Sequence, residues 1–105
     1  MSTVEMTDDN INTLVANNEF IIVDVWAEWC GPCKRFGPVF ENVSEQFENV
    51  LFAKVEADKN PNILSFFGIQ HIPTVLIIRD GELRVQHRGI MTQAVLENAI
   101  YELTK

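Results

Sequence analysis

Two cysteines separated by two residues are the most reactive side chains of this sequence. Cys30 and Cys33 are its only cysteines, and Gly31 and Pro32 stand between them. Pro32 suits the first position of a helix, where its missing N–H costs nothing, so Cys30 is expected at a helix N-terminus. The free N–H groups and the dipole of that end favour a thiolate, the nucleophilic form of cysteine. The spacing therefore predicts a redox dithiol in which Cys30 attacks a disulfide and Cys33 resolves the mixed disulfide.

The alternative for this cysteine pair is half of a zinc site. Zinc needs about four ligands, and the two histidines, His71 and His87, lack the paired local spacing of metal ligands. A disulfide between Cys30 and Cys33 would also close too short a loop to contribute much to stability. We therefore expect no metal and no cofactor other than the dithiol itself.

Asp24 is the one charged residue in the apolar run from Phe20 to Val25. Such a run is typical of a strand that is covered on both faces. A carboxylate there loses hydration, which raises its pKa and would make it a proton acceptor for Cys33. The alternative is an aspartate at a strand end that reaches solvent or a backbone amide. The strand alone leaves both interpretations open.

The remaining residues predict the elements that position these side chains. The expected strands are 4–6, 20–25, 51–56, 75–78 and 83–87, and the expected helices are 8–17, 32–48, 61–67 and 93–103. The helix 32–48 should bend at Pro38. This order gives an α/β fold with a central mixed β-sheet and helices on both faces.

Several local signals refine these elements. Thr7 is expected to cap the first helix, with Asp8 and Asp9 in its first turn. One short buried helix is expected to end at Gly68, with its apolar side chains supplied by Ile63, Leu64, Phe66 and Phe67. Asp80-Gly81 predicts a two-residue hairpin turn. Beyond it, Leu83, Val85 and His87 alternate with polar residues, as in an edge strand.

Three motifs stand out when they are taken together. They are Trp-Cys-Gly-Pro-Cys-Lys at 29–34 after a strand that contains Asp24, Ile-Pro-Thr at 72–74, and Asp-Gly at 80–81. In this combination the sequence resembles the thioredoxin family over essentially the whole chain. A Cys-x-x-C pair alone is weak evidence, but in this context it becomes specific. The resemblance implies a thioredoxin fold formed by residues 1–105 as a single domain.

The resemblance also implies an activity and the roles of individual residues. Similar proteins are general protein-disulfide reductases that a thioredoxin reductase re-reduces and that maintain cell redox homeostasis. In them Asp24 would be the base for Cys33, and Lys54 on the neighbouring strand would be its ionic partner. By itself, Lys54 is an ordinary lysine with a buried stem and a solvated ammonium group.

A substrate-docking surface follows from the same resemblance. Sequence alone favours a trans bond before Pro73, whereas the family has a cis proline that faces the dithiol and leaves the Ile72 backbone free to pair with an extended substrate. The residues that would form this surface are Trp29, Gly31, Pro32, Ile72, Pro73 and Gly89. For Trp29 the alternative is a place in the core, and Trp26 is expected to pack.

Two residues depart from the family pattern. His71 stands where small or polar residues are common, and it would either tune the dithiol as a nearby cation or remain a solvated loop histidine. Met91 would either add an apolar contact beside the docking surface or pack under the last helix.

Composition limits the classes of partner and the cellular compartment that we expect for this protein. The net charge is -7, from 15 acidic and 8 basic residues, which argues against nucleic acid as a partner. No signal peptide and no run of about 20 apolar residues is present, so we expect a cytoplasmic protein without membrane contact. We also expect a monomer, because one core would account for the apolar positions. The runner-up functions are a disulfide oxidase or isomerase, and a binding module that uses the apolar surface around Trp29 and Ile72.

Overall fold

The computed structural model describes residues 2–105. The elements are β1 (Thr3–Glu5), α1 (Ile11–Asn17), β2 (Phe20–Trp26), α2 (Gly31–Ser44), β3 (Leu51–Glu56), the 3-10 helix η1 (Ala57–Lys59), α3 (Pro61–Phe67), β4 (Thr74–Arg79), β5 (Glu82–Arg88) and α4 (Gln93–Leu103). Apart from η1, this is the predicted order. In the described part of the chain, no helix is long and apolar enough to cross a membrane.

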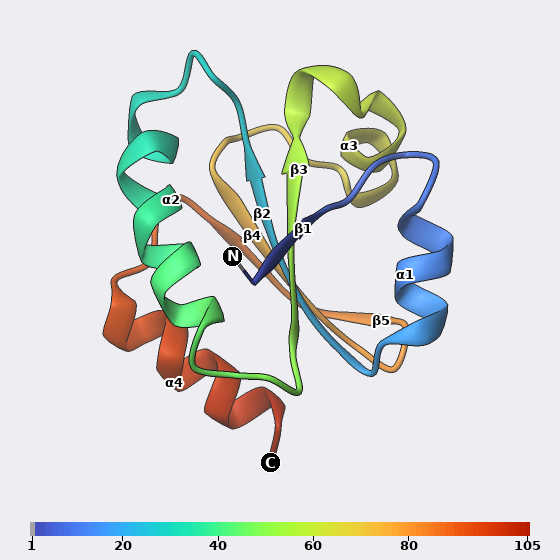
Figure 1. The fold of residues 1–105 in the computed structure, drawn as a ribbon. Coiled ribbons are helices and arrows are strands. Elements are labelled where there is room, and N and C mark those ends of the chain that lie inside the picture. Colours follow the sequence, from blue (N-terminus) through green and yellow to red (C-terminus); the bar gives the residue numbers. More distant parts are fainter. Residues whose placement is uncertain (1) are drawn as a thin grey trace.

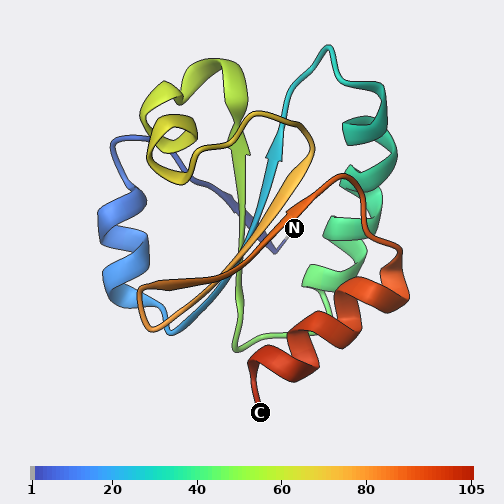
Figure 2. The same cartoon turned by 180° about the vertical axis from the view of Figure 1, so that it is seen from behind.

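The strands form one mixed sheet with β2 at its centre. The strand order is β1-β3-β2-β4-β5, in which β1, β2 and β3 are parallel while β4 is antiparallel to both β2 and β5. Helices α1 and α3 cover one face, and α2 and α4 cover the other (Figures 1 and 2). The predicted fold class is therefore confirmed. Coverage on both faces also explains why β2 is almost wholly apolar.

Alternate residues of β2 face two separate cores. Ile21 and Val23 belong to the core beneath α1 and α3, whereas Ile22 belongs to the core beneath α2 and α4. Because side chains alternate along a strand, Asp24 lies on the same face as Ile22. The β2 register therefore places the carboxylate beneath α2, the helix that carries the dithiol.

Helix α2 runs through Pro38 without a break but ends at Ser44, earlier than the predicted Glu48. The spacing of Phe47 predicted one more helical turn. Phe47 instead lies in the loop after α2, with its ring 5.3 Å from that of Tyr101 in an edge-on arrangement. The apolar spacing therefore correctly indicated that Phe47 packs against the protein, but it wrongly predicted that the backbone there is helical.

The predicted cap of the first helix is wrong. Helix α1 begins only at Ile11 and has no acidic residue in its first turn, whereas the Thr7 hydroxyl accepts the Asn10 N–H in the preceding turn at 3.2 Å. Asp8 reaches across to α3, where its carboxylate accepts the N–H groups of Asn62 at 3.1 Å and Ile63 at 2.9 Å. Asp8 thus caps a helix that is more than fifty residues away in the sequence.

The hairpin turn is confirmed, because Asp80 and Gly81 have φ values of 53° and 80°. The alternation predicted for β5 is interrupted at Arg84, since Ile78 pairs with Leu83 while Ile77 pairs with Val85. Ile77 and Ile78 face different cores, so this bulge turns Leu83 and Val85 to opposite faces of the sheet.

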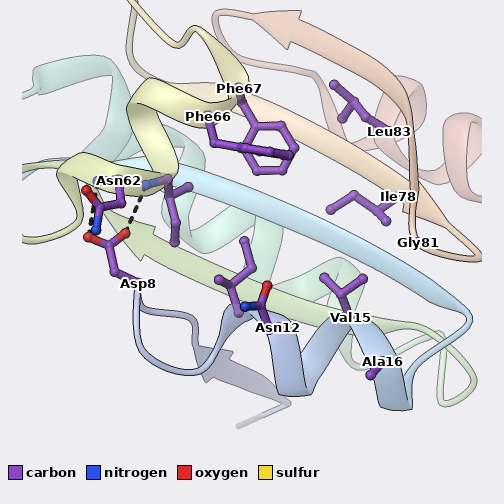
Figure 3. Close-up of a pocket in the computed structure, with 12 residues that line it drawn as sticks. Asp8, Asn12, Val15, Ala16, Asn62, Phe66, Phe67, Ile78, Gly81 and Leu83 are labelled. Atoms are coloured by element: carbon purple, nitrogen blue, oxygen red, sulfur yellow. Dashed lines mark hydrogen bonds between the residues drawn. The ribbon is translucent and has the colours of Figure 1, made fainter.

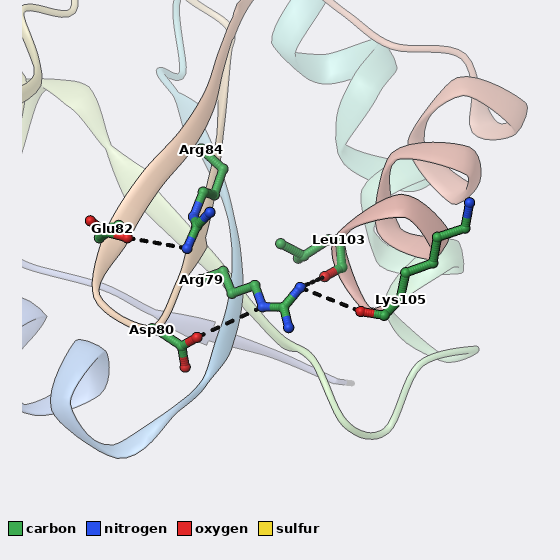
Figure 4. A network of polar contacts seen from close by, with 6 residues as sticks. All are labelled: Arg79, Asp80, Glu82, Arg84, Leu103 and Lys105. Carbon is green, nitrogen blue, oxygen red and sulfur yellow. Dashed lines mark hydrogen bonds and ion pairs between the residues drawn. The ribbon is translucent and has the colours of Figure 1, made fainter.

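The end of β4 is tied to the end of the chain (Figure 4). Arg79 donates through Nη1 to the carbonyl oxygens of Leu103 at 2.9 Å and Lys105 at 3.5 Å. The guanidinium also lies 5.3 Å from the centre of the Phe20 ring. The bond to Leu103 holds the last turn of α4 against the sheet, because it satisfies a carbonyl at the helix end that has no partner within the helix.

Candidate functional site

The two cysteines are joined by a disulfide at the N-terminus of α2. Cys30 is the extended N-cap residue, and its Sγ accepts the N–H of Cys33 at 3.2 Å. The helix begins at Gly31, so Pro32 occupies its second position, one later than predicted. Each cysteine is only 4% exposed. The Cys33 N–H, which donates to Cys30 Sγ, would also stabilise a thiolate at that atom.

Asp24 is fully buried, and neither carboxylate oxygen has a hydrogen-bond partner among the described residues. The alternative of an aspartate that reaches solvent or a backbone amide is therefore wrong. Burial raises the pKa of Asp24 from 3.8 to about 6, against the opposing effect of the positive charge of Lys54. A carboxyl group with this pKa can take up and release a proton near neutral pH.

Lys54 is the direct neighbour of Asp24 in the parallel pairing of β2 with β3. Its Nζ lies 5.5 Å from the centre of the Trp26 ring and is not within 4.0 Å of Asp24, on the described coordinates. Lys54 also lines a cavity of about 210 Å³ together with Cys33 and Gly37. The cavity therefore brings Cys33 and the strand neighbour of Asp24 to the same place beside α2.

Trp29 is 69% exposed, so the core alternative for this residue is wrong. Its indole Nε1 donates a hydrogen bond of 2.9 Å to the carboxylate of Asp58 in η1. Sequence reasoning missed Asp58, because the two residues meet only through the fold. The bond orients the exposed ring beside the dithiol, whereas Trp26 packs against the α1 and α3 core as expected.

The peptide bond between Ile72 and Pro73 is cis, as the resemblance implied and contrary to the expectation from sequence alone. Gly89, whose φ is 91°, donates its N–H to the Pro73 carbonyl at 2.8 Å. The fold thus joins two proposed docking residues that are distant in the sequence. Pro73 is buried and Ile72 is partly buried.

The two departures from the family pattern lie in different surroundings. His71 is exposed, and its backbone carbonyl accepts a hydrogen bond from the Thr74 hydroxyl. Met91 is buried in the core beneath α2 and α4, which confirms that it packs under the last helix. Within residues 2–105, no group of three or more His, Cys, Asp or Glu side chains is arranged to hold a metal ion.

Comparisons with known proteins agree with this geometry. A family model described as Thioredoxin matches residues 2–102. A Streptomyces coelicolor protein provisionally named thioredoxin 2 is 41% identical over 104 residues, which are 99% of this chain and 78% of that protein.

Two solved structures are similar throughout. The thioredoxin of Malassezia sympodialis (Mala s 13) has a TM-score of 0.89 at 30% identity and covers 99% of this chain and 92% of its own. A mutant thioredoxin of Halobacterium salinarum has a TM-score of 0.90 at 27% identity and covers 98% of this chain and 90% of its own. With its Cys-x-x-Cys pair at a helix N-terminus, the chain belongs to the thioredoxin family of oxidoreductases.

Proposed function

We propose that this protein is a general protein-disulfide reductase that carries electrons through the Cys30–Cys33 pair. The observation that carries the proposal is the disulfide at the start of α2, where Cys30 Sγ accepts a backbone N–H. A helix N-terminus stabilises negative charge, so the first cysteine is the one prepared to act as a thiolate.

The reaction runs in two exchanges. In the first, the Cys30 thiolate attacks one sulfur of a substrate disulfide, forms a mixed disulfide and releases one substrate thiolate. In the second, Cys33 loses its proton and attacks Cys30 Sγ, which releases the second substrate thiolate. The substrate gains two electrons, and the protein is left with the Cys30–Cys33 disulfide seen in the structure.

Asp24 is the proposed acceptor of the Cys33 proton, directly or through water. It lies beneath α2, it has no hydrogen-bond partner among the described residues, and burial raises its pKa to about 6. A base with a pKa close to the operating pH is well matched to this step. Lys54 acts as the partner of Asp24, because its positive charge favours the carboxylate form.

Substrates dock at the surface beside the disulfide. An extended segment pairs with the backbone of Ile72, and Trp29, Gly31, Pro32, Pro73 and Gly89 form the surrounding surface. Main-chain pairing explains how one site would accept many protein disulfides, because it requires little side-chain specificity. The exposure of Trp29 and the bond between Gly89 and Pro73 support this arrangement.

The cellular setting belongs to the same proposal. A thioredoxin reductase returns the disulfide to the dithiol, and the cycle serves electron transport and redox homeostasis in the cytoplasm. The chain acts as a monomer and a single thioredoxin domain, since one sheet with one core on each face accounts for its buried apolar residues.

Single-cysteine variants test the order of the two exchanges. We expect Cys33→Ser to accumulate a mixed disulfide with a protein substrate, detected by non-reducing electrophoresis and mass spectrometry, and Cys30→Ser to form none. Asp24→Asn should slow release from the mixed disulfide while the first exchange keeps its rate. Trapping through Cys33 in the Cys30→Ser variant would show that the roles are reversed.

Equilibration in glutathione buffers, followed by tryptophan fluorescence, tests the direction of electron flow. A potential more reducing than the glutathione pool supports the reductase, whereas a strongly oxidising value indicates an oxidase or isomerase. If the Cys30→Ser, Cys33→Ser double variant retains the biological role, the protein is a binding module instead.

A further inference from the structure

A second cavity of about 790 Å³ lies between α1, α3 and the β4–β5 hairpin (Figure 3). We call it the α1–α3 groove. Ile11 and Val15 line it from α1, Phe66 and Phe67 from α3, and Leu83 from the hairpin. Among the described residues, none that lines the groove belongs to the proposed redox site. Its volume falls within the range of sites that bind ligands in proteins.

Phe66 at the rim of the groove contradicts the prediction from sequence. The short helix α3 was expected to bury it, but Phe66 is 81% exposed, and its ring meets that of Phe67 edge-on at 4.9 Å. Leu83, which the bulge turns toward this face, is also exposed. A large exposed aromatic beside an apolar groove is typical of a surface that another molecule covers.

Among residues 2–105, the side chains that line the groove include one acid, Asp8, and no lysine or arginine. Segments 7–20 and 60–78, which include α1 and α3, contain no lysine or arginine. Acidic residues lie at both ends, with Asp8 in the wall at one end and Asp80 beside the hairpin glycine at the other. The nearest bases in sequence are already paired. Arg79 pairs with Asp80 at 3.8 Å, Lys59 with Glu56 at 3.5 Å, and Arg84 with Glu82 at 3.1 Å.

We propose that the α1–α3 groove binds a basic amphipathic helix of a partner protein. Apolar side chains on one face of that helix would enter the groove and cover Phe66, and its lysines or arginines would lie near the acidic ends. A protein segment fits better than a small molecule, because the exposed ring stands at the rim, where only a larger partner would bury it. This site adds a second interaction surface to the proposed reductase.

Two synthetic helical peptides with the same apolar face test the proposal. One has lysine and the other glutamate at the remaining positions, and each is titrated into the full-length, isotope-labelled, oxidised protein while amide chemical shifts are recorded. We expect the lysine peptide to bind at least about tenfold more tightly, with shifts in α1, α3 and the β4–β5 turn. Raising the salt concentration from about 0.05 to about 0.5 M should weaken its binding several-fold.

Surface variants locate the contact. Phe66→Gln should weaken lysine-peptide binding about tenfold, as loss of a central aromatic anchor does. Tyr101→Gln is the matched control, because Tyr101 is a 59% exposed aromatic on α4, across the sheet. Asp80→Asn, which the positive φ of the turn tolerates, should weaken binding about twofold through loss of one charge. Circular dichroism and the rate of reduction of a small disulfide should be unchanged in all three variants.

Three results would overturn the proposal. They are equal binding of the two peptides, chemical shifts centred on Trp29 instead of α1 and α3, and unchanged affinity in Phe66→Gln. Binding of a small apolar dye in the groove without binding of either peptide would likewise show that the proposed occupant is wrong.

Discussion

Replacing Asp24 with asparagine should stabilise the protein at neutral pH. Asparagine has nearly the same shape as a protonated aspartate but never carries a charge. In the wild-type protein, the buried carboxylate has no hydrogen-bond partner among the described residues, and burial raises its pKa from 3.8 to about 6. The folded state therefore holds the Asp24 proton more tightly than the unfolded state does.

The magnitude and the pH window follow from this difference. Below about pH 4, Asp24 is protonated in both states, so its raised pKa costs no stability. Between about pH 4 and 6, the free energy of unfolding of the wild type should fall by about 1.4 kcal/mol per pH unit through this group. Above pH 6 the loss levels off at about 3 kcal/mol, which is the expected advantage of Asp24→Asn.

Urea unfolding of the oxidised protein, repeated from about pH 4 to about pH 8, measures this advantage. Asp9→Asn is the matched control, because Asp9 is exposed and its loss changes the net charge of -7 by the same amount. The stability gap should open for Asp24→Asn alone. A gap that is the same at every pH, or a less stable Asp24→Asn at pH 7.5, would refute the view that desolvation of this charge dominates.

Three further substitutions test neighbouring features. Lys54→Met should raise the pKa of Asp24 further, because it removes the positive charge that lowers this pKa against the effect of burial. An NMR titration of the Asp24 carboxyl carbon measures the pKa, and an unchanged midpoint would contradict the prediction. Gly37→Ala should stabilise the folded protein by about 0.5–1 kcal/mol, because a Cβ at this helix position meets only Lys54 Nζ, at an ordinary contact distance of 3.9 Å. Thermal unfolding measures the change, and a lower melting temperature would show that the helix does not tolerate the added methyl group. Asp8→Ala should cost about 1 kcal/mol and speed amide exchange at the start of α3, whereas unchanged exchange would show that the cap is not needed.

Local sequence determined many of the helices, strands and turns, and it also determined the position of Cys30 at a helix N-terminus. The apolar run of β2 predicted a doubly covered strand, because every residue there must suit one of two cores. The Asp80–Gly81 pair predicted its turn, since the backbone conformation depends mainly on those two residues. The position of Cys30 before a proline likewise predicted a helix N-terminus.

The strand alone left Asp24 open between a buried base and an aspartate that reaches solvent. Only the resemblance to a family favoured the base and connected it with Lys54. By itself Lys54 was an ordinary lysine. The parallel register of β2 and β3 places it beside Asp24, and the crossing of α2 above them forms the cavity shared with Cys33. The register between two strands depends on how both strands align, so it cannot be read from the sequence of either strand alone.

Three features that sequence missed depend on the packing of distant segments. Asp8 caps α3 instead of its own helix, Asp58 receives the indole N–H of Trp29, and Phe66 lies in the open. Asp8 and Asp58 accept hydrogen bonds from residues that the packing of other elements brings close, and Phe66 stays exposed because no other element packs over it. Sequence alone therefore determined which segments form helices, strands and turns, because backbone preference and apolar spacing are local properties. Only the tertiary structure decided which side chains meet, because those contacts exist only after the elements pack.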